Sequence, residues 1–364
     1  MKPPRLIRSL AASALLLASA AFTSAADHSS FKRGVNISEW LSQNFGKHTY
    51  AANWFGPSDI AWIAKQGFDH IRLPVDIRLC LKPDGTLDDE KLKPVWEAIA
   101  WSKANHISVV LDAHFLPGAD FNSHGGDNRA FTDTAIMEKD AVLWGALAKR
   151  FAGEGDYLRF EILNEPVANE NQQLNPFMHR MLKAIRESNP TRIVYVTSNK
   201  WSAFSTVPDV VLPEDDHIAL TIHNYEPLIF THQRAPWVGF LSTMPPIPFP
   251  GKVPDLTGHF TPGPHSQDLH AGMELTVADV QARFDRVAEW VQAHRPGLEV
   301  YVGEFGVYHL AEDESKKRWL HAIVSECEKR DWGWAVWDYE GGFAVRDAKT
   351  GQGTAVLEGL FEKP

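Results

Sequence analysis

Two glutamates stand directly after apolar runs that are typical of buried strands. Glu165 follows the run 157–163 in Asn164-Glu165-Pro166, and Glu304 follows the run 299–303 in Gly303-Glu304-Phe305-Gly306. If both runs are strands of one barrel, the two carboxyl groups converge on the same mouth, where strand C-termini meet. Two facing carboxylates at a fixed separation are what hydrolysis of a glycosidic bond requires. The pair therefore indicates a site for that chemistry.

Residues at the other strand ends suit the same site. They are Arg72, Asp112-Ala113-His114, His223-Asn224-Tyr225 and Trp337-Asp338-Tyr339. A single strand-end carboxylate more often forms an ion pair than performs chemistry, but six strand ends with compatible groups favour an active site. Two acidic residues are exceptions. We expect Glu161 to form buried hydrogen bonds inside the barrel, and Asp112 to brace an Arg or His side chain.

The elements that must position these residues alternate along the chain. Eight strands are expected, at Lys32–Ile37, Phe68–Leu73, Ile107–Ala113, Tyr157–Leu163, Arg192–Thr197, His217–Ile222, Glu299–Gly303 and Gly333–Trp337. The segments between them carry apolar stripes at helical spacing. This order predicts an α/β fold, a single-domain (β/α)8 TIM barrel. A doubly wound open sheet is the alternative, but no Gly-rich dinucleotide loop follows any of these strands.

Three helical stripes are the clearest. They are Leu92, Val95, Trp96 and Ile99; Val277, Val280, Phe284, Val287 and Val291; and Trp319, Leu320, Ile323 and Cys327. Thr276 is a plausible N-cap for the second stripe, with Asp279 three residues later. Pro176 suits the first position of another helix. Because Cys327 belongs to a buried stripe, we expect Cys80 and Cys327 to be separate buried thiols rather than a disulfide.

The chain is acidic, with 36 Lys+Arg against 46 Asp+Glu in 364 residues and a net charge of −10. Without clustered basic residues, this excludes typical nucleic-acid binding and argues mildly against a polyanionic substrate. Residues 1–26 have the pattern of a secretory signal peptide, with a basic start, an apolar run from Leu10 to Phe22 and small residues before Asp27. We therefore expect residues 27–364 to form a secreted catalytic domain, extracellular or periplasmic, without a membrane anchor.

One long stretch, 226–275, follows the sixth strand and contains nine prolines. On a barrel it would lie over the mouth, and loops of this length are usually functional or disordered. Its aromatic residues favour an ordered cleft wall. Tryptophan faces suit pyranose rings, and the further candidates are Trp40, Trp54, Trp237, Trp332 and Trp334. Each is more often a core residue, and Trp237 on this loop is the expected exception.

The ordered set of motifs resembles family 5 of the glycoside hydrolases, the cellulase family. The motifs are Leu111-Asp112-Ala113-His114 with Pro117-Gly118, Leu163-Asn164-Glu165-Pro166, His223-Asn224-Tyr225 and Gly303-Glu304-Phe305-Gly306. The resemblance extends from about Gly34 to Trp337. The Asn-Glu-Pro tripeptide is shared with related barrel glycosidases, whereas the full set is specific. It implies a retaining mechanism without a cofactor or metal, with Glu165 as general acid/base and Glu304 as nucleophile.

The resemblance also implies roles for six substrate-binding residues. Asn164 would hold the sugar 2-hydroxyl. Arg72 and Tyr225 would hydrogen-bond the nucleophile. The remaining three would surround the ring of the cleaved sugar: His114 and His223 would line its subsite, and Trp337 would stack beneath it.

Simple physics agrees with these roles. Arg72 would hold Glu304 ionised by its opposite charge. Glu165 must be protonated to donate to the leaving oxygen, so its site should be drier. In a strand, residues an odd number apart face opposite sides, so Trp337 should face the mouth and Trp334 the helices. The two carboxyl groups should lie about 5–5.5 Å apart, as retention demands.

The substrate remains open within the family, which includes cellulases, mannanases and β-1,3-glucanases. The expected activity is that of an endo-β-1,4-glucanase acting as a monomer on a β-linked polysaccharide or oligosaccharide. A β-1,3-glucanase or other exopolysaccharide β-glucan hydrolase is the next alternative, and a β-mannanase the last. The departure from family features is the long loop after the sixth strand, which indicates no particular substrate.

Two hypotheses lie outside this class. A metal-dependent barrel hydrolase could use His114, His223 and His309, but the first strand ends in Asn36-Ile37-Ser38 and lacks the usual His-x-His pair. Loss of activity on chelation would favour it. A carbohydrate-binding protein without activity should lack one of the two carboxylates, and both are present.

Overall fold

The computed structural model describes residues 30–43, 54–121, 127–259 and 270–361, and all structural statements concern these residues. Residues 1–26, the expected signal peptide, lie outside them. Eight parallel strands form a closed barrel in the order β1-β10-β9-β6-β5-β4-β3-β2. They are β1 (Arg33–Asn36), β2 (His70–Asp76), β3 (Ser108–Phe115), β4 (Leu158–Glu161), β5 (Val194–Thr197), β6 (Ile218–Asn224), β9 (Glu299–Phe305) and β10 (Gly333–Val336). The predicted TIM barrel is therefore confirmed, with all eight expected strands in place.

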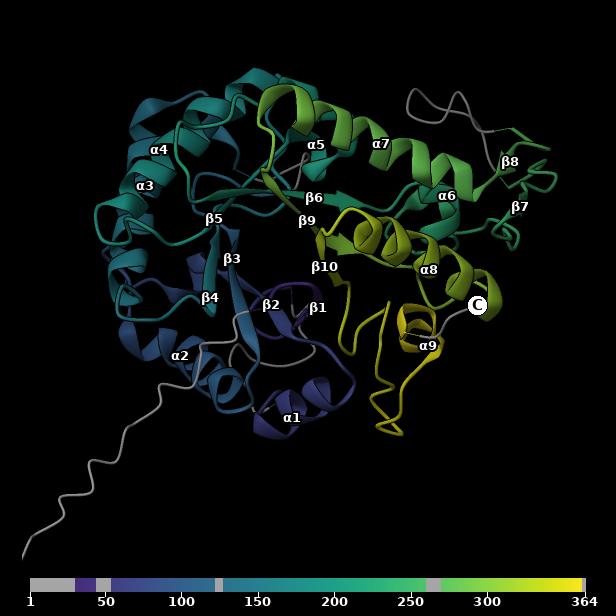
Figure 1. Cartoon of the computed structure of the whole chain (residues 1–364), viewed down its shortest axis with the longest axis horizontal. Helices are drawn as coiled ribbons and strands as arrows, with labels where there is room; N and C mark the ends of the chain where they lie inside the picture. Colours follow the sequence, from purple (N-terminus) through teal and green to yellow (C-terminus); the bar gives the residue numbers. More distant parts are fainter. Residues whose placement is uncertain (1–29, 44–53, 122–126, 260–269, 362–364) are drawn as a thin grey trace, which may run out of the picture.

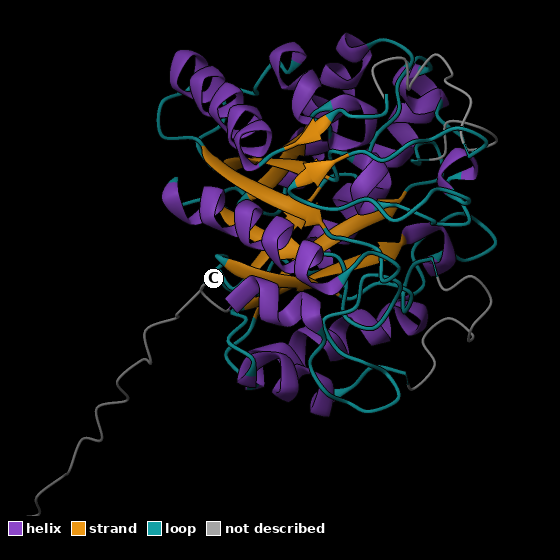
Figure 2. Cartoon of the chain, turned by 90° about the vertical axis from the view of Figure 1, so that its right-hand side faces the viewer, coloured by secondary structure: helices purple, strands orange, loops and turns teal. Residues whose placement is uncertain are grey.

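Helices surround the barrel (Figure 1). They are α1 (Pro57–Lys65), α2 (Asp89–Ala104), α3 (Thr134–Arg150), α4 (Leu174–Arg186), α5 (Asn199–Ser202), α6 (Leu228–Thr231), α7 (Val277–His294), α8 (Asp313–Lys329) and α9 (Ala355–Phe361). In Figure 2 the loops gather beyond the arrowheads of the strands, which is the end where the site residues were expected. Within the described ranges, no helix is long and apolar enough to span a membrane.

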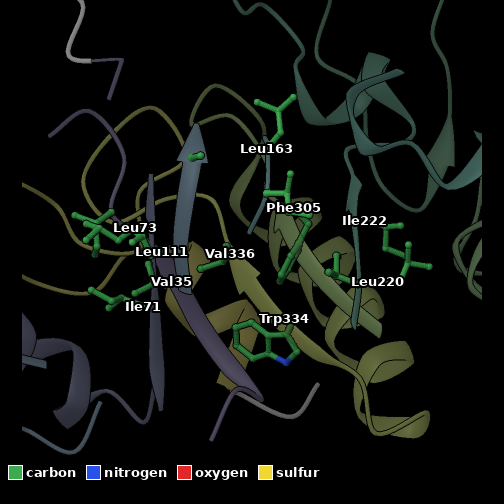
Figure 3. Packing of buried hydrophobic residues seen from close by; sticks show 14 of the residues in the cluster. Val35, Ile71, Leu73, Leu111, Leu163, Leu220, Ile222, Phe305, Trp334 and Val336 are labelled. Atoms are coloured by element: carbon green, nitrogen blue, oxygen red, sulfur yellow. The ribbon is translucent and has the colours of Figure 1, made fainter. Parts of the chain in front are cut away.

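The core forms one layer between strands and helices and a smaller one inside the barrel. Outward strand residues such as Val35, Ile71 and Leu111 pack against the helices (Figure 3). The inner cluster consists of Phe31, Val110, Tyr195, Ala219, Tyr301 and Ala335. This alternation leaves the inward positions near the strand C-termini for polar residues, so the barrel itself directs the site residues into its mouth.

Local signals are mostly confirmed. Thr276 caps α7 as predicted, because its hydroxyl accepts from the Asp279 amide while the Asp279 carboxylate accepts from the Thr276 amide. Cys80 and Cys327 are both buried free thiols. Two details differ. α4 begins at Leu174, so Pro176 is the third residue of the helix and not the first. A proline is tolerated there because the first four N–H groups of a helix have no intrahelical acceptor. Val277 is exposed because it lies in the first turn of α7, beyond the buried stripe.

The stretch after β6 has more structure than expected. Its described part contains α6, a short 3-10 turn at Gly239–Leu241 and an antiparallel pair of two-residue strands, β7 (Gly251–Lys252) and β8 (Glu274–Leu275). Buried Gln233 ties it together, donating to the Phe230 and Ile247 carbonyls and accepting from the Ile247 amide. Trp237 packs edge-on against Tyr308, which follows β9. The stretch therefore forms one wall above the barrel mouth.

Candidate active site

The mouth of the barrel opens into a cleft of about 1810 Å³. Its lining includes residues that follow every barrel strand. Seven of the eight predicted site residues line it: His114, Asn164, Glu165, His223, Tyr225, Glu304 and Trp337. The eighth, Arg72, is fully buried directly beneath them and hydrogen-bonds two of them. The structure thus brings all eight together.

Arg72 is the centre of a buried polar network. Its Nε donates to Glu161 at 2.7 Å, Nη1 to Asn36 and Glu304 at 2.9 and 2.7 Å, and Nη2 to Glu161 and Asn164, both at 2.9 Å. All five N–H groups of the guanidinium are therefore used. Asp112 adds a third carboxylate at 3.1 Å from Nη2. Because the charges are enclosed, the geometry of each partner is fixed by the others.

Both oxygens of the Glu304 carboxylate are held. Oε1 accepts from Arg72 at 2.7 Å, and Oε2 accepts from the Tyr225 hydroxyl at 2.9 Å. These are the two hydrogen bonds that the family resemblance implied. The side chain is only 5% exposed, so its orientation is set by protein groups rather than by solvent.

Glu165 lies opposite on the other side of the cleft. Its Oε1 is 2.9 Å from His223 Nδ1, and it has a left-handed backbone with φ of 43°. One carboxylate oxygen of Glu165, one of Glu304 and a ring nitrogen of His223 lie within 4.8 Å of one another. Such proximity suits direct attack by one carboxylate, because an inverting pair needs about 6.5–9.5 Å to admit a water.

The two carboxyl groups are in different electrostatic settings. Burial, followed by the charge of Glu304, raises the pKa of Glu165 well above its usual value. Burial also raises the pKa of Glu304, but Arg72 opposes this directly through its hydrogen bond. A proton entering the pair therefore belongs on Glu165, and the negative charge on Glu304.

Arg72 favours the ionised form of Glu304, although desolvation is the larger effect and leaves the Glu304 pKa above its usual value. One sequence-based expectation is wrong. The Glu165 site is not the drier one, since its side chain is 16% exposed against 5% for Glu304. The asymmetry between the two carboxyls comes from which of them contacts Arg72.

The remaining predicted residues form one side of the mouth. His114 Nδ1 lies 2.7 Å from Asp112, and its Nε2 lies 3.5 Å from Asn164 Nδ2. Burial lowers the pKa of His114 to about 3, so the ring is neutral. Trp337 lies parallel to His114, with 5.9 Å between ring centroids. Both rings line the cleft.

The expected braces are present. Glu161 and Asp112 are fully buried and both contact Arg72, and Asp112 also contacts His114. Burial raises the pKa of each carboxyl to about 7. Neither lines the cleft, in agreement with a role in holding other side chains.

Sequence reasoning missed two residues that complete the site. Asn36 accepts from Arg72 and lies within 3.0–3.3 Å of the Gly303, Ala335 and Val336 carbonyls, which joins β1 to β9 and β10. Its inward position in the first strand was the available signal. Gln43 contacts His114 Nε2 at 2.9 Å from a loop that carries no recognisable motif.

Other tryptophans divide as follows. Trp237 lines the cleft and is 59% exposed, whereas Trp334 is buried against Phe68, Phe305 and Phe361. Trp40 and Trp332 are also buried, and Trp54 packs against the core. Trp201, which we did not single out from the sequence, lines the cleft and is 45% exposed.

Glu165, His223 and Glu304 have the composition of a metal site. Four of their ligating atoms are already engaged, however: Glu165 Oε1 with His223 Nδ1, and the two Glu304 oxygens with Arg72 and Tyr225. A cation bound to Glu304 would lie beside that positive charge, so the residues do not fit a metal ion. His309 lines the cleft but contacts the Gly342 carbonyl.

Comparison with known proteins agrees with this geometry. Residues 34–342 match the family model "Cellulase (glycosyl hydrolase family 5)". The chain belongs to glycosyl hydrolase family 5. Endoglucanase C of Acetivibrio thermocellus is 30% identical over 316 residues, covering 85% of this chain and 92% of its relative.

Two solved structures of the same fold are also similar. The cellulose synthase subunit Z of Clostridioides difficile superposes with a TM-score of 0.75 at 25% identity, covering 92% of this chain and all of that one. Cel5A of Thermotoga maritima, solved with cellobiose, has a TM-score of 0.72 at 26% identity, covering 91% and 97%. This glycoside hydrolase thus has cellulase-like relatives along nearly its whole barrel.

The charge coupling predicts how Glu165 titrates. In Glu304→Gln, the pKa of Glu165 should fall, because removal of a nearby negative charge makes its ionised form less costly. Carbon-13 NMR of labelled glutamate carboxyls would follow the titration. Glu314→Gln on the surface of α8 is the control and should leave it unchanged. An unaltered or higher Glu165 pKa in Glu304→Gln would contradict the coupling.

The opposite orientations of Trp337 and Trp334 predict opposite mutant phenotypes. If Trp337 is the sugar-stacking surface that the family resemblance implies, Trp337→Ala should lower kcat/KM roughly 100-fold with little change in melting temperature. Trp334→Ala should destabilise the fold by about 3–5 kcal/mol through a core cavity. Thermal denaturation and kinetics on both variants would test this. A large stability loss in Trp337→Ala with normal activity per folded molecule would make it a packing residue.

Proposed function

We propose that this chain is a retaining endo-β-1,4-glucanase. The observation that carries the proposal is the pair Glu165 and Glu304, with oxygens within 4.8 Å in an open cleft and only Glu304 in contact with Arg72. The similarity to endoglucanases supports a β-glucan as the substrate class. No metal or cofactor takes part in the proposed reaction.

The proposed reaction has two steps at one anomeric carbon. Protonated Glu165 donates its proton to the glycosidic oxygen while Glu304 attacks the carbon from the opposite face, forming a glycosyl–enzyme ester. Ionised Glu165 then removes a proton from water, and the resulting attack frees Glu304. Arg72 and Tyr225 aim the nucleophile, and His223 holds the Glu165 carboxyl.

The extent of the cleft supports internal cleavage. A line from β4 to β9 divides the mouth into a part with β5 and β6 and a larger part with the other four strands. The half containing β1, β2, β3 and β10 includes His114, Trp337 and Leu79, and we call it the glycone half. The half containing β5 and β6 includes Trp201, Phe204 and Leu228, and we call it the leaving-group half. Sugars can therefore extend in both directions from the reacting bond.

Product analysis on a polysaccharide panel tests the function. The panel contains hydroxyethyl cellulose, mixed-linkage β-1,3/1,4-glucan, laminarin, xyloglucan and mannan. We expect a rapid fall in the viscosity of hydroxyethyl cellulose with few reducing ends released. Preference for laminarin or mannan would contradict the β-1,4-glucan assignment, and release of single terminal sugars would contradict endo action.

The assignment of Glu165 predicts a dependence on the leaving group. Glu165→Gln should strongly lower kcat/KM for cello-oligosaccharides, but affect dinitrophenyl β-cellobioside far less, because that leaving group departs without protonation. Glu304→Gln is the matched variant and should abolish activity on both. Steady-state kinetics on the two substrates would measure this. Equal losses on both substrates in Glu165→Gln would refute the acid/base role.

We also propose that the enzyme is exported. The signal-peptide pattern of residues 1–26 supports this. N-terminal sequencing of the enzyme recovered outside the inner membrane should give a start after Ala25 or Ala26, and an intact N-terminus inside the cell would contradict it.

A further inference from the structure

The leaving-group half of the cleft ends in a group of cations on an otherwise acidic protein. The residues that define this cationic end are Lys200, Trp201, Phe204, Arg283 and Arg286, all on the cleft lining. α7 supplies the two arginines, and the segment after β5 supplies the others. The two segments lie side by side (Figure 1), since Phe204 packs on Phe284 with 5.1 Å between ring centroids.

Neither arginine forms an ion pair with any residue that the structure describes. Arg283 donates a long hydrogen bond to the Asp279 carbonyl, at 3.4 Å. Among the residues that the structure describes, no carboxylate oxygen lies within 4.0 Å of either guanidinium. Elsewhere on the cleft, Arg78 is paired with Asp76 and Asp120. Arg283 and Arg286 therefore differ from Arg78 in having no ion-pair partner among the described residues.

Burial makes this arrangement costly. Arg283 is partly buried, and desolvation lowers its pKa despite the nearby charges of Glu226 and Asp279. A partly desolvated cation is destabilising unless an anion compensates it. The neighbouring charge of Arg286 adds repulsion. An anionic group arriving from the cleft would relieve both effects.

The adjoining backbone holds a sugar-sized surface in place. Lys200, Trp201 and Ser202 have φ of 52°, 62° and 56°, three consecutive left-handed residues that are not glycine. Such strain is concentrated at functional sites. It is held by Lys200, whose ammonium donates to the Ala168 and Asn169 carbonyls, and by the Trp201 indole, which donates to the Phe121 carbonyl. The half-exposed indole is therefore fixed on the same cleft lining as the two arginines.

We propose that the cationic end is a subsite for an acid-substituted sugar on the leaving-group side of the glucan. The sugar ring would stack on Trp201, and its carboxylate or phosphate ester would bind Arg283 and Arg286. The substrate would accordingly be a β-glucan that carries anionic substituents. This deepens the proposed function and rests on it for the direction of the chain. The net charge of −10 disfavours polyanions in general, but the local arrangement reverses that preference here.

The kinetic test compares soluble celluloses of equal chain length and substitution. Carboxymethyl and phosphorylated cellulose are the anionic substrates, and hydroxyethyl cellulose is the neutral one. The double variant Arg283→Gln/Arg286→Gln should lower the anionic-to-neutral ratio of kcat/KM by about 10-fold, mainly through KM. Arg318→Gln, an exposed arginine on α8, is the matched control and should keep the ratio. Adding 1 M NaCl to the native enzyme should also lower the ratio, because salt screens exposed charges.

The outcomes separate the two proposals. If hydroxyethyl cellulose is cleaved but the double variant keeps the native ratio, the subsite is refuted and the glucanase assignment stands. If no cellulose is cleaved, affinity electrophoresis in gels containing the same polymers decides. Retardation by an anionic polymer that disappears in the double variant would support the subsite, and equal retardation of both proteins would refute it. If the double variant lowers the kcat/KM ratio for only one of the two anionic polymers, the acidic group of that polymer, carboxylate or phosphate, is the one that the subsite prefers.

Discussion

The site is organised around one buried cation. Arg72 uses every N–H of its guanidinium, and its partners come from β1, β4, the segment after β4 and β9. Removing this cation would leave several buried carboxyls without compensation, which is strongly destabilising. The same contacts that stabilise the barrel mouth thus orient Glu304, so fold and chemistry share one network.

This network also explains how two similar glutamates differ. Both are enclosed, and burial raises the pKa of each. The negative charge of Glu304 is stabilised by hydrogen bonds from Arg72 and Tyr225. Glu165 instead contacts neutral His223 and lies close to the negative charge of Glu304. One carboxyl is therefore suited to carry charge and the other a proton, which is the division that double displacement requires.

Strand ends could be predicted from the sequence because the barrel repeats one rule. Each apolar run is followed by the side chain that enters the mouth, which located Glu165, Glu304 and Trp337. Residues whose role depends on tertiary contacts were not accessible in this way. The inward strand position of Asn36 was visible in the sequence, but its contacts with β9 and β10 appear only in the folded barrel, and Trp201 is recognisable only when a left-handed turn exposes it. The relative dryness of the two glutamates was also misjudged, because exposure depends on how loops close over the cleft.

Covalent labelling tests the central claim most directly. The enzyme would be incubated with 2,4-dinitrophenyl 2-deoxy-2-fluoro-β-cellobioside, whose fluorine slows both steps while its good leaving group allows the first. Mass spectrometry of the intact protein and its peptides should find one added fluorocellobiosyl group, attached to Glu304. Attachment of the group to Glu165 would contradict this mechanism. So would turnover of the reagent without inactivation of the enzyme, with no adduct and with a product of inverted configuration.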